Sequence, residues 1–119
     1  PDGIVSLSLG NGDDSAKAMV VQADGKIIVA GTSTSTGGSS NIVIERFSAG
    51  ADPNLADPTS GLVILRIPHP TFTNHFGGQV AFGPDGKLWI TSSDRQAMTP
   101  AQDLQSALGK LIRTFCIMP

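Results

Sequence analysis

Short runs of alternating apolar and polar residues follow one another along this chain, a pattern typical of half-buried β-strands. Two of these runs, Ala18–Val21 and Ile27–Gly31, are similar to Gln79–Phe82 and Leu88–Ser92, which lie 61 residues further along. Asp-Gly-Lys stands between the members of each pair. Glycine accepts the positive φ of a tight hairpin turn, and aspartate tolerates it. The pattern therefore predicts two similar β-hairpins, one in each half of the chain.

Each hairpin has a further strand-like run on either side. These runs are Ile4–Leu9 and Asn41–Phe47 in the first half, and Leu62–Ile67 and Lys110–Phe115 in the second. Residues 49–61 are rich in proline, glycine and aspartate, which predicts a loop. We expect one β domain, residues 1–119, made of two four-stranded units, about 1–50 and 61–119, joined by this loop.

A four-stranded antiparallel meander of this size is the unit of a β-propeller. One such sheet cannot bury both of its faces, so blades stack on one another, and known rings have at least about four blades. The fold prediction is therefore an all-β chain of two four-stranded antiparallel propeller-type blades, completed by oligomerisation. A homo-oligomer of three copies, which gives a six-bladed ring, is the leading expectation. A small β-sandwich or barrel is the alternative.

One segment departs from the strand pattern and predicts a short helix, Pro100–Gly109. Thr99 can cap its start, Pro100 suits the first helical position, and Gly109 suits the end. The helix would lie within the second unit, between its last two strands.

Composition narrows the classes of function. The net charge is −2 and the basic residues are scattered, so nucleic-acid binding has little electrostatic support. No apolar run approaches the roughly 20 residues that span a bilayer, and we expect no membrane partner. The single cysteine, Cys116, excludes an internal disulfide and is interpreted as a small buried apolar residue.

The imidazole of His75 is of the kind that can take a proton from a hydroxyl group near neutral pH. The glycines that follow, Gly77 and Gly78, would let a planar cofactor approach the backbone closely. The alternative is that His75 only forms hydrogen bonds within a loop before a strand. His69, between two prolines, is interpreted as a surface loop residue. Trp89 is interpreted as core packing between blades, in preference to a platform for a sugar ring.

Metal ligands are sparse in this sequence. No second His or Cys stands at the spacing of a zinc site. The pairs Asp13–Asp14 and Asp52/Asp57 can offer oxygens to calcium, but the ligand pattern of a dedicated calcium loop is absent. These aspartates are therefore interpreted as turn formers, and no metal site is predicted from them.

Residues 3–50 resemble a delta-60-type propeller repeat through two stretches, Gly12–Gly31 and Ile42–Phe47. This resemblance implies a blade fold and no known chemistry. Residues 57–114 are similar to the soluble glucose/sorbosone dehydrogenase family through Asn74–Ile90 and Pro100–Arg113. Members of that family are six-bladed quinoproteins that use pyrroloquinoline quinone and calcium.

The second resemblance assigns a role to one residue. Family members carry a His-Asn-Gly-Gly-like stretch, in which the histidine is the general base on the sugar hydroxyl, and this role carries over to His75 alone. Phe76 replaces the asparagine, and Ser92–Arg95 replaces a Gly-Asp-Gly-Gly-like loop. The family's other quinone and calcium contacts lie on blades that this chain lacks. We therefore expect no cofactor on the isolated chain, with pyrroloquinoline quinone and calcium implied only by the resemblance.

The leading functional hypothesis is a non-catalytic propeller-type structural or binding module that self-associates. Its sequence would be a hybrid of two families or a fragment of a longer protein. The isolated chain is expected to be a module and not an enzyme. The first alternative is part of a quinone-dependent sugar dehydrogenase with His75 as general base. The second alternative is a carbohydrate-binding module, with a carbohydrate as its ligand. The resemblances imply a periplasmic or extracellular bacterial location.

Overall fold

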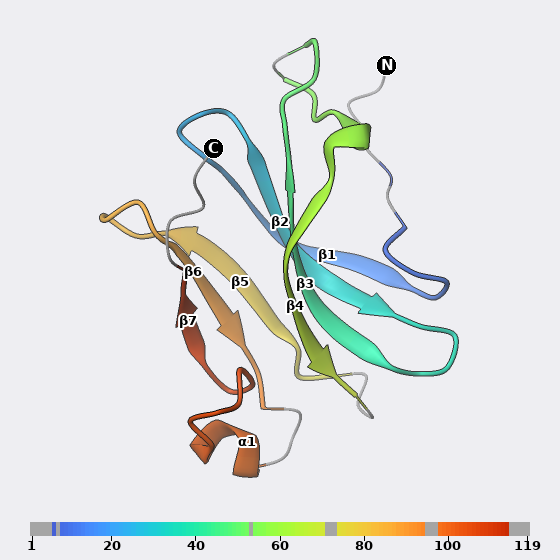
Figure 1. The fold of residues 1–119 in the computed structure, drawn as a ribbon, viewed down its shortest axis with the longest axis vertical. Helices are drawn as coiled ribbons and strands as arrows, with labels where there is room; N and C mark the ends of the chain where they lie inside the picture. Colours follow the sequence, from blue (N-terminus) through green and yellow to red (C-terminus); the bar gives the residue numbers. More distant parts are fainter. Residues whose placement is uncertain (1–5, 7, 53, 71–73, 95–97, 115–119) are drawn as a thin grey trace.

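The computed structural model describes residues 6, 8–52, 54–70, 74–94 and 98–114. Its strands form two antiparallel sheets in which sequential strands are neighbours (Figure 1). The first sheet holds β1 (Asp14–Val21), β2 (Ile27–Thr34), β3 (Ser40–Phe47) and β4 (Leu62–His69). The second sheet holds β5 (Gly77–Phe82), β6 (Leu88–Ser92) and β7 (Leu111–Arg113). The helical segments are the 3₁₀ turn Pro58–Ser60 and α1 (Met98–Gln102).

Both predicted Asp-Gly turns are confirmed, and their geometry is the same. Gly25 has φ 83° and Gly86 has φ 70°, values that an L side chain rarely adopts. In each turn the amide of the following lysine donates to the aspartate, at 3.1 Å to Asp24 Oδ1 and at 3.0 Å to Asp85 Oδ1. The repeat in the sequence therefore corresponds to equivalent hairpins in two different sheets.

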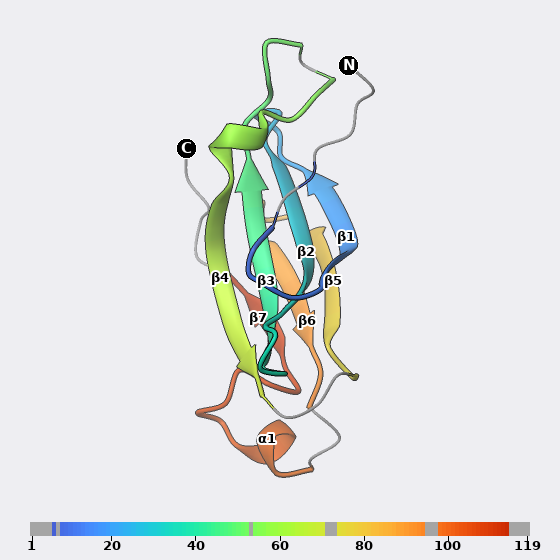
Figure 2. The same cartoon turned by 90° about the vertical axis from the view of Figure 1, so that its right-hand side faces the viewer.

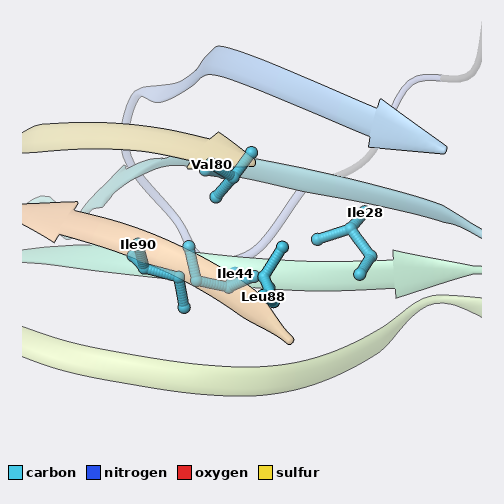
Figure 3. Close-up of a cluster of buried hydrophobic side chains, with 6 residues drawn as sticks. Ile28, Ile44, Val80, Leu88 and Ile90 are labelled. Atoms are coloured by element: carbon cyan, nitrogen blue, oxygen red, sulfur yellow. The ribbon is translucent and has the colours of Figure 1, made fainter. Parts of the chain in front are cut away.

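The core lies between the two sheets, where β5 packs against β1 and β2. Alternate residues of each strand point toward the opposite sheet, as the period of two predicts. Figure 3 shows side chains from both sheets meeting in this layer. The buried members of this first cluster are Ile28, Ala30 and Ile44 from the first sheet and Val80, Leu88 and Ile90 from the second.

A second cluster lies at the end of the molecule nearer α1. It joins Ile42 and Ile67 of the first sheet to Leu108, and the ring of Phe76 packs against it. The two clusters together hold one sheet on the other, and the second cluster supports the segment that carries His75.

The other face of the first sheet, called the open face below, is buried at Val43 and Phe47 but exposed along β1. Figure 2 views the molecule from this side, with the second sheet behind. Met19 and Val21 at the β1 edge are 65% and 55% exposed, and a groove of about 620 Å³ runs over neighbouring residues that include Val29 and Phe47. Glu45 lies buried in this groove, and burial raises the pKa of its carboxyl group.

The predicted boundary between the two units is wrong. The strand predicted at Leu62–Ile67 pairs with β3, with Ile67 opposite Ile42, and so completes the first sheet. The second sheet has three strands within the described ranges. The loop before β4 is closed on itself, because Ser48 N donates to Ser60 Oγ at 2.8 Å and Ala49 bridges Ala56. A loop rich in proline and glycine looks the same in sequence whether it joins strands of one sheet or of two.

The predicted strand Ile4–Leu9 falls largely outside the described residues, and Ser6, Ser8 and Leu9 are not in a strand. The tail from residue 115, including Cys116, also lies outside them.

The helix is shorter than predicted, Met98–Gln102 instead of 100–109. Asp103 ends it, because Asp103 Oδ1 accepts from the amide of Gln105 at 2.9 Å and starts a separate turn. No helix in the described ranges has the length and apolar character needed to cross a membrane.

Candidate functional site

His75 lies directly before β5 with its side chain exposed. Its backbone has φ 57°, and no other non-glycine residue in the described part of the chain has a positive φ. Gly77 and Gly78 continue the unusual path with φ 75° and 97°. A left-handed conformation at a residue with a side chain persists only where the surroundings hold it, and such residues cluster at functional sites. The geometry therefore singles out the same residue as the sequence does.

The prediction that His69 is a surface loop residue is wrong. His69 is the last residue of β4 and is 0% exposed. Its Nε2 donates to the carbonyl oxygen of His75 at 3.1 Å. Because a carbonyl oxygen only accepts, this contact assigns a proton to Nε2 of His69. The flanking prolines suggested exposure, but Pro68 is tolerated in an outer strand and the alternation of burial continues through it to His69.

Phe76 has a packing role. Its ring centroid lies 4.5 Å from that of His69, with the two planes tilted by 43°. Its carbonyl oxygen accepts from the amide of Ser93 at 3.2 Å. The residue that replaces the family's asparagine therefore anchors the histidine segment to both sheets.

The glycine pair is used by the chain itself, although Gly77 is exposed. A Cβ at Gly77 would lie 2.9 Å from the carbonyl oxygen of Thr91, so glycine is required there for close pairing with β6. A Cβ at the buried Gly78 would lie 3.8 Å from the side chain of Lys17, which stands in the bulge of β1. The space that these glycines leave next to the backbone is thus taken up by β6 and by the Lys17 side chain.

Ser92 and Ser93 connect the end of β6 to the turn before β7. Ser92 Oγ donates to the carbonyl oxygen of Ala107 at 2.5 Å and accepts from the amide of Lys110 at 3.1 Å. Ser93 accepts from the amide of Gly109 at 3.0 Å. The stretch that replaces the family's Gly-Asp-Gly-Gly-like loop therefore supports the backbone next to Phe76.

The Glucose / Sorbosone dehydrogenase family model matches residues 13–115. The chain belongs to this family. The match extends beyond the resemblance at residues 57–114 and covers both sheets. The resemblance of residues 3–50 to a delta-60-type repeat stays a prediction.

Solved structures confirm the propeller-type fold. A glucose dehydrogenase crystal structure has 23% identity and a TM-score of 0.72, and the match covers 92% of this chain and 32% of that one. The soluble aldose sugar dehydrogenase of Escherichia coli, in its apo-form, has 23% identity, a TM-score of 0.71 and coverages of 87% and 30%. The PQQ-bound aldose sugar dehydrogenase of Streptomyces coelicolor has 24% identity, a TM-score of 0.62 and coverages of 92% and 31%. The chain thus spans about a third of each, as two stacked sheets of a propeller.

The described residues fit one part of the family's site. They include the exposed imidazole of His75, beside which Gly77 pairs closely with β6 and Gly78 lies next to Lys17. Within the described ranges, no group of three or more His, Cys, Asp and Glu side chains is placed to hold a metal ion. Asp57 accepts from Thr59 N at 2.8 Å, and such bonds hold the pKa of Asp57 below its usual value and make it a turn former. These residues therefore give calcium no part in the chemistry proposed below.

Trp89 does not join the core between these two sheets, and its packing against a further blade stays a prediction. Leu88 and Ile90 point into that core, so Trp89 lies on the other face of β6. The guanidinium carbon of Arg113 lies 5.9 Å from the centroid of the Trp89 ring. Arg113 Nε also donates to Asp85 Oδ2 at 2.9 Å. This contact lowers the pKa of Asp85 and ties β7 to the second hairpin turn.

Family membership favours the sugar-dehydrogenase alternative over the non-catalytic module that the sequence analysis put first. The chain is related to part of a quinone-dependent sugar dehydrogenase.

Proposed function

We propose that this chain forms two neighbouring blades of a quinone-dependent sugar dehydrogenase and that His75 is its general base. One observation carries the proposal: in a chain of this family, the exposed histidine at the start of β5 is held in a left-handed backbone conformation. Such a conformation is retained where the direction of a side chain matters.

The chemistry needs one base beside the reacting carbon. The sugar hydroxyl loses its proton to the imidazole of His75 while the hydrogen on the same carbon leaves as hydride. Pyrroloquinoline quinone, when bound, supplies the two-electron acceptor for that hydride. The carbon is oxidised from the alcohol or hemiacetal level to the carbonyl or lactone level. This chain contributes the proton acceptor and the backbone that directs it.

The rest of the site requires further blades. The open face of the first sheet presents Met19 and Val21 to solvent, which is unfavourable unless another sheet covers them. Copies of this chain are the proposed cover, with a trimer giving the six blades of a ring. Because copies repeat the same residues, the quinone and calcium would be held where residues of several copies meet, since the described residues of one chain form no such group. A periplasmic or extracellular location is part of the same proposal.

The test adds pyrroloquinoline quinone, calcium, glucose and a redox dye to the associated chain. We expect dye reduction that falls by roughly 100-fold or more in His75→Ala, the usual size of a general-base contribution. Ala23→Ser is the matched control, because Ala23 is exposed in the turn before β2, at the opposite end of the first sheet from His69.

Two results would contradict the proposal. One is a quinone spectrum unchanged by the protein, and the other is a rate of dye reduction that His75→Ala leaves intact. Glucose binding measured by calorimetry, without dye reduction, would instead support the carbohydrate-binding alternative.

A further inference from the structure

His69 is a fully buried histidine that the proposed proton transfer does not use. We propose that His69 is a positioning residue, whose Nε2 proton holds the carbonyl of His75 and thereby fixes the backbone conformation that directs the His75 side chain. This role deepens the proposed function and rests on it for its catalytic part. The structural part stands on the contacts alone.

The hydrogen bond connects the end of one sheet to the start of the other. His69 closes β4, where it is paired with Ser40 of β3, and His75 precedes β5. His69 is 0% exposed and Ser40 is 2% exposed, so the donor side of the 3.1 Å bond to the carbonyl of His75 is shielded from water. A hydrogen bond in such a dry environment is electrostatically stronger than one in water.

Two successive carbonyl groups are held from opposite sides. The carbonyl of His75 is held by His69 of the first sheet, and that of Phe76 by the amide of Ser93 after β6. The ring of Phe76 also packs on the ring of His69. The direction of the His75 carbonyl depends on the backbone torsions of His75, so a change to the right-handed or extended region would break the bond to His69. The bond therefore favours the φ of 57° over the conformations that a histidine ordinarily prefers.

The test compares His69→Leu, which removes the donor, with His69→Gln, whose side-chain nitrogen lies about where Nε2 does. The readouts are the carbonyl ¹³C shift of His75 and the amide ¹⁵N shift of Phe76, which belong to one peptide group. We expect both shifts to move in His69→Leu and to return toward wild type in His69→Gln. Unchanged methyl signals of Ile28 and Ile90 serve as the control for an intact core.

Turnover gives the second readout. Loss of one neutral hydrogen bond changes a conformational population by about fivefold, so we expect kcat to fall about fivefold in His69→Leu with KM nearly unchanged. His69→Gln is expected to restore most of kcat. A variant that only destabilised the chain would not show this split or the rescue.

The outcomes are distinguishable. The positioning role is wrong if His69→Leu leaves both shifts at their wild-type values, or if the Leu and Gln variants behave alike. If His69→Leu does not fold, a long-range ¹H–¹⁵N spectrum of the unaltered chain decides, since an imidazole without a proton on Nε2 contradicts the proposal. If the shifts move as expected but the wild type oxidises no sugar, the proposed function fails and the positioning role stands.

Discussion

Replacing Ile90 by alanine tests whether the layer between the two sheets holds the fold together. Ile90 is 0% exposed and lies in the first cluster, with Ile28 and Ile44 contributed by the opposite sheet. The three carbon atoms removed lose about 2.4 kcal/mol of transfer free energy. The cavity left behind raises the expected loss in free energy of unfolding to about 2–5 kcal/mol.

The assay is equilibrium unfolding in urea. Trp89 is the single tryptophan and lies beside Ile90 on β6, so its fluorescence reports on the second sheet. With a slope of about 1–3 kcal/mol per M, the midpoint is expected to fall by about 0.7–5 M. The measurement is repeated at several protein concentrations, because the proposed self-association would contribute to apparent stability.

Leu104→Ala is the matched control, since Leu104 is 89% exposed and loses the same kind of group. We expect this control to change the free energy of unfolding by less than about 0.5 kcal/mol. Equal midpoints for the two variants would refute the reasoning, because the sheets would then be held together by something other than the aliphatic layer. If Ile90→Ala is unfolded without urea, Ile90→Val should show a graded loss of about 0.5–1.5 kcal/mol.

Three further predictions concern the open face and the turns. Burial raises the pKa of Glu45, so its carboxyl group makes the folded chain lose stability as pH rises from the unfolded-state pKa of about 4.3 through the folded-state pKa. In Glu45→Gln the urea midpoint should therefore fall less between pH 4 and pH 7 than it does in the wild type. An identical fall in both would contradict this. Gly86→Ala, at φ 70°, should lower the free energy of unfolding by about 1–2 kcal/mol in thermal melts, whereas the exposed Gly37→Ala should not. Light scattering should give a multiple of 12.3 kDa, lowered by Met19→Asp, and a monomeric wild type would contradict self-association.

Local signals in the sequence predicted the parts of the fold that local chemistry decides. The two Asp-Gly pairs fixed both hairpins, because the positive φ and the aspartate–amide hydrogen bond are set within a few residues. In β6 the alternation gives no signal, because Leu88, Trp89 and Ile90 are all apolar, and only the structure shows that Leu88 and Ile90 fill the layer between the two sheets. The candidate base, His75, came from a resemblance, and its role as a base stays a prediction.

The errors arose where a pairing between distant segments decides the outcome. The assignment of β4 to a sheet depends on the register with β3, which neither strand encodes by itself. His69 is buried because β4 continues through Pro68 and the segment 74–76 returns over it, as the bond to His75 and the contact with Phe76 show. The helix ended early because Asp103 satisfies the backbone locally, a competition that helix-end signals at Pro100 and Gly109 do not reveal.

The matching turns have a consequence for the order of folding. Each closes a hairpin of neighbouring strands, and such hairpins form in about 1–10 μs. The layer that Ile28 and Ile90 share joins residues 62 positions apart, so its formation requires closure of a much longer loop. We therefore expect the β1–β2 and β5–β6 hairpins to form independently and the sheets to dock afterwards. Weakening the layer should then speed unfolding more than it slows folding, so the lifetime of the native state depends on the contacts made last.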